Sequence, residues 1–151
     1  MTYPLLKEKI IVLLKKSDQT IDSKLSQICE LLRQEVEHYD WVGFYFANKE
    51  TKTLHLRTFS GKETDHTVIP FGKGICGQVA VSNSNFVVPD VKAQDNYIAC
   101  SIDVKSEIVI PLFKDGENIG QIDIDSNSLD PFSEIDEEFL VWVNEQVAEV
   151  L

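Results

Sequence analysis

The sequence predicts an α+β domain in which helices flank a mostly antiparallel sheet. Apolar residues recur at helical spacing near both ends of the chain, which is typical of amphipathic helices. Between these ends lie segments rich in β-branched and aromatic residues, separated by short turn sequences that indicate hairpins. The 151 residues fit a single domain with one sizeable core, so we assign residues 1–151 to one domain.

Two helices are expected before the first strand, at residues 4–16 and 21–38. The second carries a one-sided apolar stripe that includes Cys29, so this cysteine is expected to pack in the core.

The first expected strand, at residues 41–47, is apolar on both faces. Side chains alternate along a strand, so Val42 and Phe44 point to one side while Trp41 and Tyr45 point to the other. Both sides must therefore be covered. Helices can cover one, and the other needs a lid made by later parts of the chain.

A second strand at 53–59 makes a hairpin with the first. Residues 60–106 then show little regular pattern beyond a short helix at about 75–82 and a brief strand, NFVVP. Long irregular insertions in compact domains are usually functional. We therefore expect this insertion to be the lid over Trp41 and Tyr45.

Two further strands, at 106–113 and 119–126, are joined by the turn KDGEN. Pro111 implies an edge position or a bulge in the first of them. In the second, alternate isoleucines face the core and place Asp123 and Asp125 together on the opposite face. A closing helix follows from Ser133, where Ser133 and Asp136 resemble a capping box. Its expected apolar stripe consists of Ile135, Phe139, Val143, Val147 and Val150 or Leu151.

Composition excludes several classes of partner. The net charge of −11 disfavours nucleic acid and anionic membrane surfaces, but it suits a small cationic or zwitterionic ligand. The apolar run at 10–14 is too short to span a membrane, and its flanks do not form a signal peptide. Three cysteines without a CxxC pair do not form a disulfide framework, so we expect a cytoplasmic protein.

Several motifs have ordinary structural explanations. Gly72, Gly74 and Gly77 spell G-x-G-x-x-G, but no parallel crossover follows, so a tight turn is favoured over nucleotide binding. Cys76 lies between glycine and an apolar run, which leaves packing and reactivity both open. A metal site made of Cys76, Cys100 and His66 lacks a close ligand pair, and no metal is expected.

Cys100 is the better candidate for a reactive thiol, because it lies in a polar loop. Glu107, Asp123 and Asp125 lie on the strands that follow it. Carboxylates crowded in a half-buried pocket raise one another's pKa, so one of them is expected to hold a proton for a leaving oxygen. The remaining negative charge suits a substrate that carries a cation.

Together these segments resemble the free methionine-(R)-sulfoxide reductases, which are stand-alone GAF domains. The resemblance spans almost the whole chain and rests on YPLL, WVGFY, IPFGKGICG, VVPDV, YIAC, SEIVIPLF and IGQIDIDS. It implies an antiparallel sheet of about six strands with the N- and C-terminal helices on one face and the ligand pocket on the other. It also implies a homodimer, a free amino acid as substrate, no bound cofactor and an external reductant such as thioredoxin.

The resemblance also assigns roles to individual residues. Cys100 matches the catalytic cysteine, and Ile98 and Ala99 lie in the segment that presents it. The other matches are the acids that hold the ammonium group and assist protonation, Glu107, Asp123 and Asp125, and the aromatic wall, Trp41 and Tyr45. The implied chemistry is thiolate attack on the sulfoxide sulfur, which leaves a sulfenic acid on Cys100.

The chain departs from the family pattern at two positions. The usual resolving cysteine would fall on His66, and no residue from 60 to 70 is a cysteine. Ser101 stands where an aspartate commonly follows the catalytic cysteine. Regeneration must therefore use Cys76 or an external thiol. The missing cysteine also motivates an alternative, a GAF domain that binds a small ligand or senses redox state without turnover.

Overall fold

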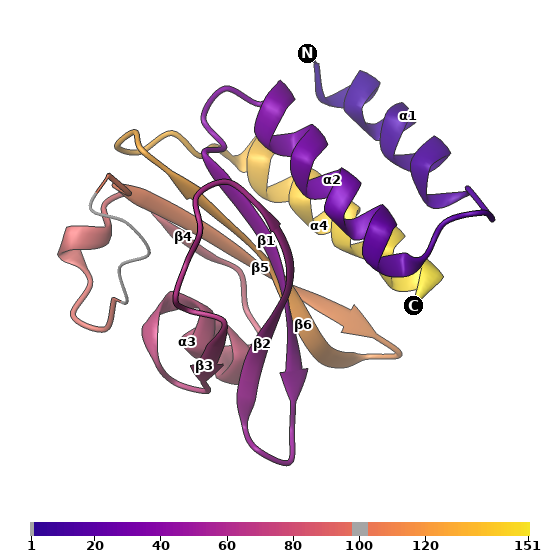
Figure 1. The fold of residues 1–151 in the computed structure, drawn as a ribbon. Helices are drawn as coiled ribbons and strands as arrows, with labels where there is room; N and C mark the ends of the chain where they lie inside the picture. Colours follow the sequence, from indigo (N-terminus) through magenta and orange to yellow (C-terminus); the bar gives the residue numbers. More distant parts are fainter. Residues whose placement is uncertain (1, 98–102) are drawn as a thin grey trace.

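The computed structural model describes residues 2–97 and 103–151 (Figure 1). Its helices are α1 (Tyr3–Leu14), α2 (Ile21–Glu35), α3 (Gly74–Ser82), the 3₁₀ turn η1 (Val91–Ala93) and α4 (Glu134–Val150). Its strands are β1 (Trp41–Asn48), β2 (Thr53–Ser60), β3 (Val68–Pro70), β4 (Phe86–Val88), β5 (Ser106–Lys114) and β6 (Glu117–Ser126). No helix within these described residues is long and apolar enough to cross a membrane.

The strands form one antiparallel sheet in the order β3-β2-β1-β6-β5-β4, which confirms the predicted architecture. Helices α1, α2 and α4 lie on one side of the sheet, and α3 lies on the other (Figure 1). The prediction that the second helix reaches residue 38 was wrong. The backbone becomes extended at Val36, whose side chain is buried in the core.

Each face of the sheet has its own apolar core, as the alternation in β1 predicted. Val42 and Phe44 pack with the helices, whereas Trp41 and Tyr45 pack with residues of α3 and β3. Cys29 is fully buried in the core beneath the helices, which confirms its packing role. The long insertion therefore supplies the cover for the second face.

The sequence-based account of this insertion missed β3. That strand has three residues, and it pairs with β2 directly before the glycine-containing turn. The glycines do form a tight turn: the backbone N–H of Gly72 donates to the carbonyl oxygen of Gly77, 2.8 Å away. A Cβ at Gly77 would lie 2.6 Å from the carbonyl oxygen of Pro70, so a larger residue does not fit there.

Pro111 satisfies the edge-or-bulge expectation in an indirect way. Strand β5 lies inside the sheet order, but β4 pairs only with its residues 107–109, so the β4 side of β5 has no strand partner at Pro111. A register shift follows between Leu112 and Phe113. The side chain of Asn144 in α4 donates to the carbonyl oxygens of Ile110 and Pro111, and thereby closes this open edge.

The first turn of α4 corrects one predicted core residue. Ile135 is 60% exposed, whereas Asp136 beside it is buried. The capping box of Ser133 and Asp136 is present as predicted. Asp136 also accepts hydrogen bonds from the hydroxyls of Tyr3 and Tyr39, and its Oδ1 lies 2.9 Å from the Nε2 atom of His38. These contacts orient the helix so that Asp136 points inward and Ile135 points to solvent.

Asp136→Asn should lower the free energy of unfolding at neutral pH by about 2–3 kcal/mol, because a charged acceptor with several donors is lost. Burial alone would raise the pKa of Asp136, but hydrogen bonds from His38, Tyr3, Ser133 and Tyr39 hold that pKa well below its usual value. The stabilisation is therefore present above the unfolded pKa, near 3.8, and is lost as the pH falls below it. Urea unfolding of both proteins at several pH values measures this difference, which should shrink in acid. A constant difference across the acid range would contradict the assignment.

Candidate functional site

Three buried carboxylates lie on the face of the sheet that α3 and the insertion cover. Asp125 in β6 pairs with Glu107 in β5 on one side and with Trp41 in β1 on the other. Asp123 lies two residues earlier on the same strand face. Their exposed fractions are 4% for Glu107 and 1% for each aspartate. These acids are therefore part of an enclosed site, because solvated surface carboxylates are rarely buried to this degree.

An aromatic wall stands beside the acids. The ring of Trp41 stacks on Phe59 with 5.6 Å between centroids, and its centroid lies 6.5 Å from that of Tyr45. Gly43 makes room for this arrangement, since a Cβ there would lie 2.4 Å from the Trp41 ring. Gly43 was not among the residues predicted for the site, although a glycine inside a strand signals a close approach of this kind.

The same two aromatics hold the segment between β2 and β3 in place. The indole N–H of Trp41 donates to the carbonyl oxygen of Lys62 at 3.0 Å. The hydroxyl of Tyr45 donates to the carbonyl oxygen of His66 at 2.8 Å. Two long-range hydrogen bonds therefore connect the aromatic wall to the segment between β2 and β3 that covers it.

Cys76 enters the site from the first turn of α3. Its thiol donates to Oε2 of Glu107, with 3.7 Å between sulfur and oxygen, and the side-chain amide of Gln121 donates to its carbonyl oxygen at 3.1 Å. Burial, followed by the charges of Asp123 and Glu107, raises the pKa of the Cys76 thiol well above its usual value. The residue is therefore packed and also part of the site, while its reactivity stays a prediction.

The surroundings of Asp123 favour its protonated form. Burial raises the pKa of Asp123, and hydrogen bonds from the side chains of Glu107 and Cys76 oppose this shift only in part. A carboxyl with a raised pKa holds its proton longer and is suited to deliver that proton to an oxygen atom.

Two cavities open onto this arrangement. The outer cavity measures about 110 Å³ and is lined by Trp41, Asp125 and residues of the covering segments, including Lys62 and Asp103. The ammonium of Lys62 lies 2.8 Å from the carboxylate of Asp103 across the rim. The inner cavity is smaller and is lined by Tyr45, His66, Ile69, Lys73, Gly74, Ile75, Cys76, Glu107 and Asp123.

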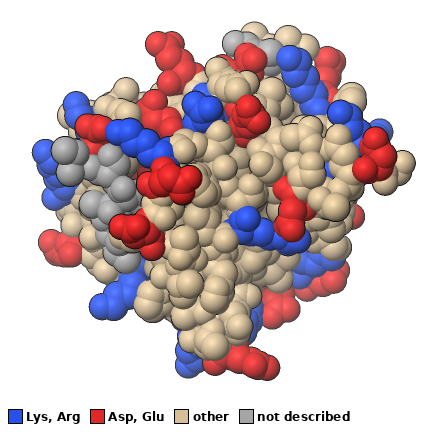
Figure 2. Space-filling model, in the orientation of Figure 1, with Lys and Arg blue, Asp and Glu red and all other residues tan. Residues whose placement is uncertain are grey.

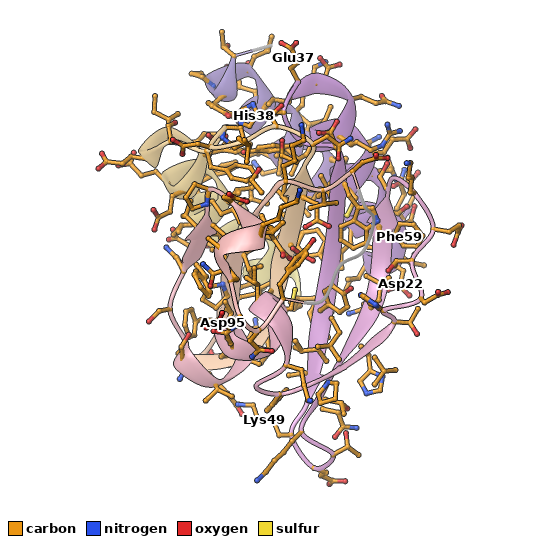
Figure 3. All side chains as sticks on the ribbon, turned by 90° about the vertical axis from the view of Figure 1, so that its left-hand side faces the viewer. Asp22, Glu37, His38, Lys49, Phe59 and Asp95 are labelled. Carbon is orange, nitrogen blue, oxygen red and sulfur yellow. The ribbon has the colours of Figure 1, made fainter. Side chains whose placement is uncertain are left out.

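Figure 3 views the molecule from the left-hand side of Figure 1. Glu37 and His38 lie at one end and Lys49 at the other, with α3 and the segment bearing Asp95 toward the viewer. The face drawn in Figure 2 carries acidic and basic side chains next to one another, without a continuous basic patch. A larger groove of 540 Å³ is lined by residues of α1 and α2, and these helices lie on the other side of the sheet from α3 (Figure 1).

The structure brings together most of the residues that the sequence singled out. Trp41, Tyr45, Cys76 and the three acids Glu107, Asp123 and Asp125 all line the two cavities. His66, where the resemblance would place a resolving cysteine, lines the inner one. Cys100, Ile98, Ala99 and Ser101 lie outside the described residues.

Comparison with known proteins gives consistent matches. The GAF domain family matches residues 18–151. The chain is 39% identical to GAF domain-containing protein A of Dictyostelium discoideum, over 80% of this chain and 75% of that protein. It is 36% identical to the free methionine-R-sulfoxide reductase of Escherichia coli, over 84% of this chain and 75% of that protein. The substrate complex of the Neisseria meningitidis enzyme of that name superposes with a TM-score of 0.89 at 35% identity, covering 98% of this chain and 87% of that one.

Proposed function

The chain belongs to the GAF domain family, and we propose from this premise that it reduces free L-methionine-(R)-sulfoxide to methionine. The observation that carries the proposal is the row of buried acids, Glu107, Asp123 and Asp125, beside the aromatic pair Trp41 and Tyr45. Relatives named as free methionine-R-sulfoxide reductases support this function over a binding domain without turnover.

The acids would recognise the part of the substrate that makes it a free amino acid. An ammonium group satisfies buried carboxylates by charge-assisted hydrogen bonds. A methionine sulfoxide within a peptide has no such group and would leave these charges uncompensated, which is costly in a buried site. Trp41 and Tyr45 would pack against the thioether end.

Cys100 would supply the nucleophile. Its thiolate attacks the sulfoxide sulfur while a site carboxyl, for which Asp123 is suited by its raised pKa, protonates the oxygen. The oxygen passes to Cys100 as a sulfenic acid, and methionine leaves with its sulfur reduced by two electrons. A second thiol then condenses with the sulfenic acid, which releases water and forms a disulfide. We propose that thioredoxin, or a reductant like it, reduces this disulfide in the cytoplasm, and that no cofactor is bound.

The direct test uses dithiothreitol, which makes the assay independent of the natural reductant. The protein should consume the R epimer of racemic free methionine sulfoxide and leave the S epimer, as followed by chiral chromatography. Loss of both epimers at equal rates, or of neither, would overturn the proposed activity.

Cys76 is our candidate for the resolving thiol. The chain has three cysteines, and Cys29 lies in the core on the other side of the sheet, so Cys76 is the remaining partner for Cys100. Cys76→Ser should therefore lose turnover with thioredoxin as the reductant but keep it with dithiothreitol. Cys29→Ser is the matched control and should keep both. Undiminished thioredoxin-dependent turnover in Cys76→Ser would show instead that an external thiol reduces Cys100 directly.

We also propose a homodimer, with the groove between α1 and α2 as the contact surface. Leu5 and Val12 are 45% and 63% exposed there, and lysine and glutamate side chains line the same groove. Exposed apolar side chains and charges of both signs let the same patch face its own copy, as a two-fold interface requires. Sedimentation velocity should give twice the chain mass, and Val12→Glu should convert the protein to a monomer.

A further inference from the structure

Cys76, Glu107 and Asp123 offer one sulfur and two carboxylate oxygens that all lie within 4.8 Å of one another. All three residues are buried. This set differs from the combination of Cys76, Cys100 and His66, which lacks a close ligand pair in the sequence. We propose that these three side chains bind a zinc-like divalent cation, and that the cation competes with the ammonium group of the amino acid.

The geometry suits zinc in particular. A tetrahedral ion with Zn–S of about 2.3 Å and Zn–O of about 2.0 Å holds the two ligand atoms roughly 3.5 Å apart. The sulfur of Cys76 and Oε2 of Glu107 are 3.7 Å apart, so this sulfur–oxygen distance needs almost no change to accept the ion. A mixed set of thiolate and carboxylates selects zinc over magnesium or calcium, which prefer oxygen ligands alone.

A second observation points to a cation at this place. Oδ1 of Asp123 is buried and has no hydrogen-bond partner among the described residues. A buried carboxylate oxygen without a donor is destabilising unless a ligand satisfies it. The inner cavity beside it, lined by Cys76, Glu107 and Asp123, has room for about one water-sized sphere, 10 Å³. That space is too small for a second organic group but suits a single ion.

Binding would exchange protons for the metal. The cation replaces the thiol proton of Cys76, and any proton held by the carboxyl pair, so protons are released to solvent. Three protein ligands leave the fourth position of the tetrahedron without a protein donor. The cation would then hold Glu107 and Asp123, two of the three acids proposed to bind the ammonium group, and would place a positive charge beside them. Inhibition of methionine sulfoxide reduction by the bound cation rests on the proposed function, but the metal site itself does not.

The binding test avoids enzyme activity. It uses protein with Cys100→Ser, because the thiol of Cys100 could otherwise hold the metal. Calorimetric titration with zinc chloride in two buffers of different ionisation enthalpy should give one equivalent bound and at least one proton released. Adding Cys76→Ser should weaken zinc binding by more than the roughly 10–100-fold that loss of an outer-shell partner costs.

Controls make the outcome specific. Adding Cys29→Ser instead should leave zinc binding unchanged, since that thiol lies in the other core, and excess magnesium should not displace zinc. Circular dichroism confirms that each variant is folded. No binding, or binding that Cys76→Ser leaves unchanged, overturns the site. Free L-methionine should raise the apparent dissociation constant for zinc. A dissociation constant that methionine leaves unchanged would contradict the competition.

Discussion

Cys100→Ser should abolish the reduction of free L-methionine-(R)-sulfoxide while leaving its affinity for the ligand within about twofold. Serine keeps the size and the hydrogen bonding of the side chain, but its hydroxyl does not form the nucleophilic anion that attacks sulfur. The expected loss is complete within detection, because no other thiol in the chain is proposed to attack the substrate. Turnover is measured with dithiothreitol, and binding by calorimetry with methionine.

The matched variant for this experiment is Cys29→Ser, which changes a buried thiol on the opposite side of the sheet. It should retain turnover, and thermal unfolding measures its stability separately. Turnover by Cys100→Ser above the rate of a control without protein would assign the nucleophile to another residue. Cys76→Ser in the same assay identifies whether that residue is Cys76.

Asp125→Asn should weaken ligand binding by about 1.5–3 kcal/mol, or roughly 10–150-fold, because it removes one charge-assisted hydrogen bond to the ammonium group. The substitution preserves shape in a position where the side chain is 1% exposed, between Trp41 and Glu107 in the neighbouring strands. Calorimetry with free L-methionine measures the change.

Specificity of this effect is tested with two comparisons. Glu37→Gln removes one negative charge from an exposed position at one end of the molecule and should leave affinity unchanged (Figure 3). Methionine amide, which keeps the ammonium group but lacks the carboxylate, should show the same relative loss in Asp125→Asn as methionine does. A loss confined to methionine would contradict a contact between Asp125 and the ammonium group, because both ligands carry that group.

The parity of side chains along the strands was enough to predict the two faces of the sheet. Trp41 and Tyr45 on one side, with Val42 and Phe44 on the other, required two covering layers, and the structure has both. The shared face of Asp123 and Asp125 followed from the same rule. These predictions succeed because a strand repeats every two residues whatever it packs against.

The contact between Cys76 and Glu107 was beyond such reasoning, since it joins residues 31 positions apart through the packing of α3 on the sheet. The exposure of Ile135 was missed for a related reason. Hydrogen-bond donors from distant parts of the chain turn Asp136 inward. The spacing of apolar residues alone does not predict a buried acid. The three-residue strand β3 is too short to show alternation.

The measurement that tests the central claim most directly compares free L-methionine-(R)-sulfoxide with its N-acetyl derivative under identical conditions with dithiothreitol. If the buried acids select the ammonium group, the free amino acid is reduced and the acetylated compound, which lacks that charge, is not. Equal rates on the two compounds would contradict the role of Glu107, Asp123 and Asp125 as the site that recognises a free amino acid.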